Sequence, residues 1–227
     1  MVQTLVNSRS SPDSKAGRKQ REILRAASRA FRRKGLHATG MRDIATESGM
    51  HVGNLYYYFQ NKQELLAFCQ EQTLSNLIDL AEQIRRQSWP ADEKLFRLIT
   101  GHVVRLNDDI PGSLAHLEVE ALEPPWKREI LKQRNRYEAL LRQIIQEGIK
   151  TGLFRSTNPG VTAKAILGAT NWTVKWFSPR GSKTSLEIGQ EFADLLVRGL
   201  LTPGREPSIT AVRSDPQDHR SSEERRN

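Results

Sequence analysis

The segment MRDIATESGMHVGNLYYYF, residues 41–59, contains two short helical patterns that decide the fold of the N-terminal region. The first covers residues 41–48, has an acid in its first turn and is followed directly by Gly49, a residue that commonly ends a helix. The second covers about 52–58. Two short helices joined by a tight glycine turn have the layout of a helix-turn-helix.

The residue types at three positions support this layout. Ala45 supplies a small side chain beneath the helix crossing, Gly49 lies in the turn, and Leu55 places an apolar side chain on the second helix facing the first. In such a motif the second helix enters the major groove of DNA while the first lies across the backbone. The spacing therefore predicts a DNA-binding unit.

Three of the four tyrosines of the chain are consecutive, at Tyr56, Tyr57 and Tyr58. Three consecutive helical positions spread over about 200°, so one helix face cannot bury all of them. Leu55 and Phe59, four residues apart, form the better core pair. We therefore expect Tyr56 and Tyr57 to be exposed and to contact DNA, whereas Tyr58 stays open between core and surface.

Positive charge is concentrated at the same end of the chain. Residues 1–62 hold 12 Lys and Arg against four acids, although the whole chain of 227 residues has a net charge of only +9. A helix predicted over 18–34 carries many of these arginines, and Gly35 follows it as a C-cap. The distribution indicates a polyanion-binding module on a near-neutral body, with a merely solvated basic helix face as the alternative.

The remaining sequence predicts an all-α fold, because apolar residues recur at three and four positions and no segment alternates as a strand does. Helical patterns cover, in order, about 74–84, 95–106, 113–122, 126–150, 158–177 and 184–200. The single cysteine, Cys69, excludes an intramolecular disulfide. Neither a signal-like leader nor a membrane-length apolar segment is found, so we expect no membrane association and a cytoplasmic location.

Composition also predicts the domain boundaries. Residues 1–17 and 203–227 are polar and too poor in apolar groups to offset the entropy of ordering, so we expect both tails to be disordered. Between them we expect a DNA-binding domain over 18–62 and a larger helical domain over 63–202.

Residues 23–66, ILRAASRAFRRKGLHATGMRDIATESGMHVGNLYYYFQNKQELL, resemble the DNA-binding domain of TetR-type transcriptional regulators without a gap. The matching positions include Ala30-Phe31, Gly35, Thr39, Asp43 to Ala45, Gly49, Gly53, Leu55-Tyr56, Phe59, Lys62 and Leu65-Leu66. The resemblance implies a homodimer with an N-terminal three-helix DNA-binding domain. It also implies a C-terminal helical bundle that binds an effector and dimerises through its last two helices.

The resemblance also implies roles for individual residues. Those facing bases or nearby phosphates in the groove would be Arg42, Val52, Gly53 and Asn54, and those holding phosphates would be Thr39, His51, Tyr56, Tyr57 and Lys62. The chain departs from the family at Gly40, His51 and Tyr58, where Ser or Thr, Ser, and His are frequent. Glycine caps a helix tolerably and histidine poorly, so the phosphate contacts at these caps are the weaker part of the match.

Nothing in the sequence indicates an enzyme, a metal site or a cofactor. The five histidines lack metal-ligand spacing, and no phosphate-cradling glycine loop, nucleophile elbow or HExxH motif is present.

Candidate effector-binding residues are His102, Asn171, Trp172 and Trp176. His102 lies on an apolar stripe, which favours a satisfied core histidine over a ligand contact, and Asn171 is similarly ambiguous. The tryptophans follow small residues on one helix side, which favours a dimer interface or core over a ligand cage. The stretch NWTVKWF resembles TetR-type regulators of fatty-acid and steroid catabolism, whose effectors are often acyl-CoA thioesters.

The sequence thus predicts a dimeric, ligand-responsive transcription factor and favours a repressor over an activator. It would bind a palindromic DNA operator and be released by a small hydrophobic effector, with acyl-CoA as a candidate. Two alternatives are an effector-independent helix-turn-helix protein and an enzyme that handles acyl thioesters in its helical domain.

Overall fold

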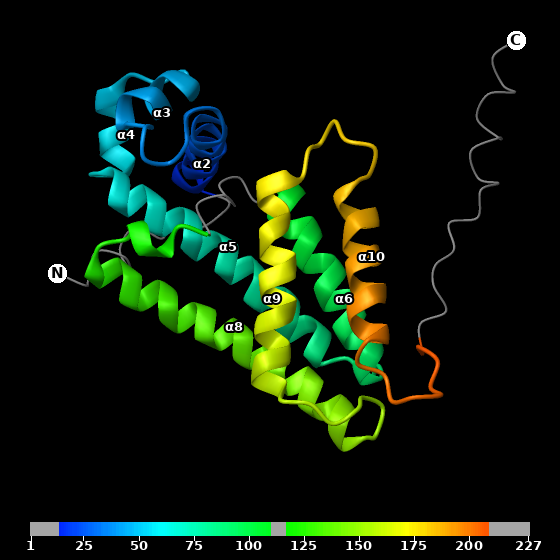
Figure 1. Cartoon of the computed structure of the whole chain (residues 1–227). Helices are drawn as coiled ribbons and strands as arrows, with labels where there is room; N and C mark the ends of the chain where they lie inside the picture. The colour runs from blue at the N-terminus through cyan, green and yellow to red at the C-terminus, as the bar shows by residue number, and fades with distance from the viewer. Residues whose placement is uncertain (1–13, 110–116, 209–227) are drawn as a thin grey trace, which may run out of the picture.

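The computed structural model describes residues 14–109 and 117–208, and the regular elements of these residues are helices. They are α2 (Lys15–Lys34), α3 (Met41–Glu47), α4 (Val52–Tyr58), α5 (Lys62–Arg85), α6 (Ala91–Val104), the π-helix η1 (Arg105–Asp109), the 3-10 helix η2 (Val119–Ala121), α8 (Pro124–Lys150), α9 (Pro159–Trp176) and α10 (Ser185–Arg198). The predicted all-α fold is confirmed (Figure 1). Within the described ranges no helix combines the length and apolar character needed to cross a membrane.

Helices α2, α3 and α4 form a small head at one end of the molecule (Figure 1). Its core contains Ile23, Phe31 and Ile44 together with the predicted pair Leu55 and Phe59, which are 0% and 2% exposed. The short helices α3 and α4 contribute few apolar residues each, so they depend on this shared core for their stability.

Ion pairs fasten α3 to α2 across the surface of the head. Glu47 accepts hydrogen bonds from Arg29 Nε and Arg33 Nη1, each at 2.7 Å, and Asp43 pairs with Lys34. These pairs are solvent-exposed and contribute little to the free energy of folding. They do, however, occupy three of the basic residues that give the head its positive charge.

Helix α5 joins the head to the body of the protein. Near its start, Leu65 and Leu66 belong to the hydrophobic cluster of the head, whereas Leu77 and Ala81 belong to the cluster of the body. The side chain of Asn61 caps the helix by accepting a hydrogen bond from Glu64 N at 2.8 Å. A single continuous helix therefore connects the two cores.

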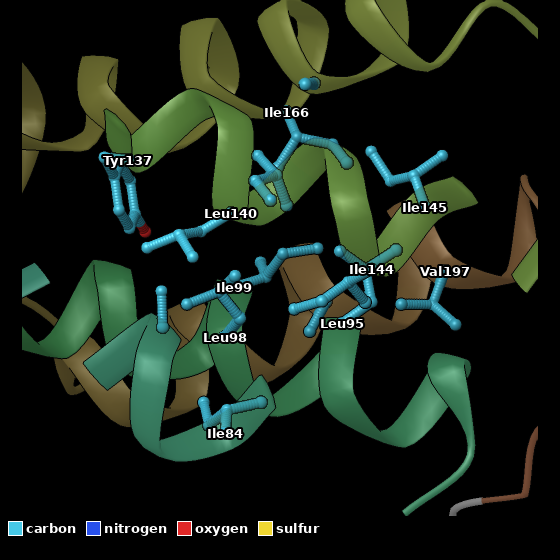
Figure 2. Close-up of a cluster of buried hydrophobic side chains, with 14 of the residues drawn as sticks. Ile84, Leu95, Leu98, Ile99, Tyr137, Leu140, Ile144, Ile145, Ile166 and Val197 are labelled. Atoms are coloured by element: carbon cyan, nitrogen blue, oxygen red, sulfur yellow. The ribbon is translucent and has the colours of Figure 1, made fainter. Parts of the chain in front are cut away.

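The body is a bundle in which α5 packs along α8 and α6 packs along α10, with α9 lying against both α8 and α6 (Figure 1). Side chains of α6 and α8 meet in its core, where Leu95, Leu98 and Ile99 lie opposite Leu140 and Ile144 (Figure 2). The bundle closes at its far end through an isolated backbone bridge between Phe154 and Leu201.

Several predicted boundaries differ from the structure. Pro124 and Pro125, predicted to precede the helix, form the first turn of α8, where proline's missing N–H would have had no helical partner. Of the helix predicted over 113–122, residues 113–116 lie outside the described residues, and only the 3-10 turn Val119–Ala121 is helical among the rest.

The predicted disorder of the two tails concerns mostly residues outside the described ranges. The predicted end of the N-terminal tail at residue 17 is wrong, because α2 begins at Lys15 and not at 18. Ser14 caps the helix there by accepting a hydrogen bond from Gly17 N at 3.0 Å, which supports three further helical residues.

Gly148 on α8 generates a stability prediction. A Cβ at this position would lie 2.1 Å from the ring of Phe154, which is itself 2% exposed. Gly148→Ala should therefore lower the free energy of unfolding by about 1 to 2 kcal/mol, although alanine is intrinsically the better helix former. Urea unfolding followed by circular dichroism measures the change. In a chain that already carries Phe154→Leu the ring is absent, so Gly148→Ala should lower the free energy of unfolding by less than it does in the native chain. An equal loss in both chains would contradict the steric explanation.

Candidate DNA-binding surface and effector cavity

Helix α4 presents a mostly exposed face with aromatic side chains at its end. Gly53 and Asn54 are exposed, and Tyr56 and Tyr57 are 46% and 84% exposed. His51, at the N-cap, accepts a hydrogen bond from Gly53 N through Nδ1 at 3.3 Å, so it caps the helix better than its residue type suggests. The predicted inward residues Leu55 and Phe59 are thus buried and most of the predicted DNA-facing residues of α4 are exposed, whereas Val52 is half-buried against the hydrophobic cluster of the head.

The structure gives Tyr58 a position that the sequence left open. Its side chain is half-buried against the hydrophobic cluster of the head, and its ring meets that of Tyr57 edge-on at a centroid distance of 5.2 Å. The ring of Tyr58 therefore packs against the exposed ring of Tyr57 and restricts its position.

Arg42 lies at the second position of α3 and is exposed. It forms no ion pair with the described residues, in contrast to Arg29, Arg33 and Lys34. Its guanidinium thus remains available for a base edge or a phosphate.

Two predicted phosphate contacts do not fit the geometry. Thr39 is only 1% exposed, and its hydroxyl donates to Gly35 O at 2.7 Å, so it stabilises the turn between α2 and α3 instead of facing DNA. Lys62 is half-buried, and its Nζ donates to the backbone carbonyls of Leu36 and His37. Burial lowers the pKa of Lys62. The sequence could not reveal these partners, because they lie 25 and 26 residues away from Lys62 in the chain.

The body contains a cavity of about 130 Å³ between α5, α6, α8 and α9. It is lined by Leu74, His102, Arg134, Tyr137, Glu138, Leu167 and Asn171. Two of the predicted effector-binding residues, His102 and Asn171, are thus brought together there. Leu74, Arg134, Tyr137, Glu138 and Leu167 were not predicted, although a tyrosine on the apolar stripe of the long helix was a detectable signal.

His102 is the centre of a buried hydrogen-bond network in this cavity. Its Nδ1 lies 2.8 Å from the hydroxyl of Tyr137, and its Nε2 lies 3.1 Å from Oδ1 of Asn171. Because an amide oxygen only accepts, this arrangement places the proton on Nε2 and makes the Tyr137 hydroxyl the donor to Nδ1. The imidazole also stacks on the Tyr137 ring at a centroid distance of 5.6 Å.

Burial sets the protonation state of this network. Removal from water lowers the pKa of His102 from 6.5 to about 4, against a smaller opposing effect of the Asn171 hydrogen bond. Burial likewise raises the pKa of the Tyr137 hydroxyl. Both groups are therefore neutral near pH 7, and they act as hydrogen-bonding groups rather than charges.

Trp172 and Trp176 do not line this cavity. They are 61% and 48% exposed, so of the two alternatives that the sequence favoured over a ligand cage, a dimer interface fits the exposure and the core of the single chain does not. Trp176 stacks on Phe192 of α10 at a centroid distance of 6.3 Å. The other large exposed apolar side chains of α9 and α10 are Val161, Leu186 and Leu195.

A second and larger pocket, of about 570 Å³, lies between the head and the body. Its lining comes from α2, α5 and α8 and includes three carboxylates, Glu71, Asp79 and Glu129, and two arginines, Arg21 and Arg136. The guanidinium of Arg136 is already paired with Glu82. No group of metal-ligating side chains gathers in the ranges 14–109 and 117–208.

The depressed pKa of His102 predicts a pH dependence of stability. His102 of the unfolded chain binds a proton below about pH 6.5, whereas His102 of the folded chain does so only below about pH 4. Protons therefore favour the unfolded chain as the pH falls below 7, and the protein loses stability there. We expect a loss of about 2 kcal/mol between pH 7 and pH 5 from His102 alone.

Urea unfolding at fixed protein concentration and several pH values measures this dependence. His102→Gln should flatten the slope between pH 7 and pH 5, whereas the control His37→Gln, at an exposed position, should leave it unchanged. Equal slopes for the native chain and His102→Gln would contradict a neutral buried imidazole.

Known proteins share both parts of this architecture. Residues 23–68 match the family of bacterial regulatory proteins of the tetR type, and residues 88–200 match the tetracyclin repressor-like C-terminal domain. The transcriptional repressor KstR2 of Rhodococcus jostii is 27% identical over 192 residues, which cover 83% of this chain and 94% of the relative.

Two solved structures illustrate the similarity. The regulator PfmR from Thermus thermophilus superposes with a TM-score of 0.72 at 29% identity, covering 79% of this chain and 99% of PfmR. AibR, in complex with isovaleryl coenzyme A and operator DNA, superposes with a TM-score of 0.69 at 24% identity, covering 81% of this chain and 98% of AibR. With both its N-terminal and its C-terminal parts matched, this chain belongs to the TetR family of transcriptional regulators.

Proposed function

We propose that this protein is a dimeric repressor that binds a palindromic DNA operator through α4 and is released from it by a small hydrophobic effector. The observation that carries the proposal is the exposed surface of α4, together with the exposed Arg42 on the neighbouring helix α3. Leu55 and Phe59 hold the helix from within, so Asn54, Tyr56 and Tyr57 are left facing outward. Hydroxyl, amide and guanidinium groups are suited to phosphates and base edges.

Dimerisation is supported by the apolar surface of the last two helices. Trp172, Val161 and Leu195 are 61%, 65% and 73% exposed, which is unusual for side chains of this size. A two-fold interface through α9 and α10 would remove them from water and would place two copies of α4 on one face of the dimer. The two half-sites of the operator would then lie about one helical turn of DNA, or a multiple of it, apart.

An effector in the body is supported by the cavity around His102 and by the binding of isovaleryl coenzyme A to the related AibR. A fully packed body would instead have favoured the effector-independent alternative. We place the functional division between a DNA-binding domain over 18–62 and an effector-binding and dimerisation domain over 63–202. Acyl-CoA thioesters are the candidate effectors.

The path of coupling is supported by Leu74 of α5. Its side chain belongs to the hydrophobic cluster that runs from the head along α5 to Val119 and to Ile130 of α8, and it also lines the cavity. A ligand that favours one position of Leu74 and α5 would therefore act on the packing of the head. A difference of about 1 to 3 kcal/mol between two states is a typical coupling of this kind.

The DNA-binding part is tested by selecting bound sequences from random DNA with the full chain, which should yield an inverted repeat. Arg42→Ala should then lower the ratio of operator to random-DNA affinity by about tenfold, because a base contact carries discrimination. Arg32→Ala removes the same charge from an exposed site on α2 and should weaken both affinities alike. Equal losses on both DNAs for Arg42→Ala would remove Arg42 from base recognition.

The dimer is tested by placing a charge on its proposed surface. Leu195→Asp should shift the chain from dimer to monomer in sedimentation experiments, because a carboxylate would be buried without a partner. Leu131→Asp, at a less exposed apolar site on α8, serves as the matched control and should remain dimeric. A fully dimeric Leu195→Asp would place the interface elsewhere.

A further inference from the structure

The cavity around His102 restricts the size of the ligand group that enters it. Its volume is about 130 Å³, and the adjoining void beside Leu98, Leu141 and Ile166 adds only about 10 Å³. An engineered protein cavity of about 150 Å³ accommodates benzene, a molecule of six carbon atoms. Ligand sites for drug-sized molecules are larger, at about 300 to 1,000 Å³. A sterol nucleus or a long fatty-acyl chain is therefore too large to lie wholly within this space.

The polar side of the cavity offers hydrogen-bond donors. Because Oδ1 of Asn171 already accepts from His102, its amide nitrogen remains as a donor. Arg134 adds a guanidinium, whose five N–H groups can serve more than one acceptor at once, and burial lowers its pKa. Arg105 is close enough to influence the pKa of Tyr137 as a second positive charge. Glu138 is the one carboxylate in the lining.

The other side of the cavity is apolar. Leu74 of α5 and Leu167 of α9 provide this surface, and Leu167 also borders the adjoining void. A ligand that fits both sides carries a short hydrocarbon group next to an oxygen acceptor. An acyl group, with its carbonyl beside its chain, has this chemistry.

We propose that the cavity binds a short acyl group of up to about six carbon atoms, whose carbonyl oxygen accepts hydrogen bonds from Asn171 and Arg134. This inference rests on the proposed function and specifies its effector. The acyl group reaches the cavity either as a free carboxylate or as a thioester of coenzyme A. The larger pocket near the head is the poorer site for an anionic ligand, because it has three carboxylates against two arginines, one of which, Arg136, is already paired with Glu82.

The direct test is calorimetric titration of the full chain without DNA. The ligands are 3-methylbutanoyl-CoA, free 3-methylbutanoate, hexadecanoyl-CoA and coenzyme A alone. We expect one of the two short ligands to bind at least about tenfold more tightly than both hexadecanoyl-CoA and coenzyme A, and the tighter of the two identifies the source of the acyl group. Tighter binding of hexadecanoyl-CoA, or binding of neither short ligand, would overturn the proposal.

Variants locate the binding in this cavity. Leu167→Trp fills the space and should abolish binding of the short ligand, whereas Leu131→Trp adds the same ring outside the cavity and should bind as the native chain does. Arg134→Gln should weaken binding about tenfold by removing a charge-assisted hydrogen bond, and Arg142→Gln, exposed two turns further along α8, should not.

Thermal unfolding verifies that each variant is folded, and if Leu167→Trp is not, the Arg134 pair decides the question. Unchanged binding by folded Leu167→Trp, or by Arg134→Gln, would contradict the assignment. The titrations contain no DNA, so a failure of the ligand prediction is distinguishable from a failure of operator binding, which the selection on random DNA measures separately.

Discussion

The two ends of α5 are buried in two different hydrophobic cores, and the rest of the structure depends on this constraint. One helix of 24 residues, about 36 Å long, places Leu65 and Leu66 in the core of the head and Leu77 and Ala81 in the core of the body. Neither end can shift along its axis without disturbing a packed core, because well-packed interiors resist small displacements. Leu74 lies between these groups, where the head cluster meets the cavity. Helix α5 thus connects the cavity with the hydrophobic cluster that includes the core of the head.

The head uses its charges for two different purposes. Arg29, Arg33 and Lys34 are paired with Glu47 and Asp43, so they fix α3 against α2. Arg42 of α3 remains outside these pairs and faces solvent. A net positive charge attracts a protein to DNA, and here the basic residues that hold α3 in place differ from the one that stays exposed on it.

The body combines an apolar bundle with a buried polar network around His102. Tyr137 and Asn171 provide hydrogen-bond partners for both ring nitrogens of His102, and burial keeps the imidazole neutral, so the network does not require a buried charge. Such a network favours a single arrangement of α6, α8 and α9, since a partly satisfied one costs more than an apolar core. Asn171 and the nearby Arg134 line the same cavity as the apolar side chains of Leu74 and Leu167.

The sequence by itself determined the helix-turn-helix, the all-α fold and the inward direction of Leu55 and Phe59, because these follow from spacing within one or two neighbouring helices. Tertiary structure alone decided that Thr39 and Lys62 are engaged inside the head, that Trp172 is exposed, and that Arg134 and Tyr137 join His102 and Asn171. His102 and Asn171 are 69 residues apart. Their meeting depends on how α6, α8 and α9 pack, and helical periodicity gives the buried face of each helix without giving the partner that it faces.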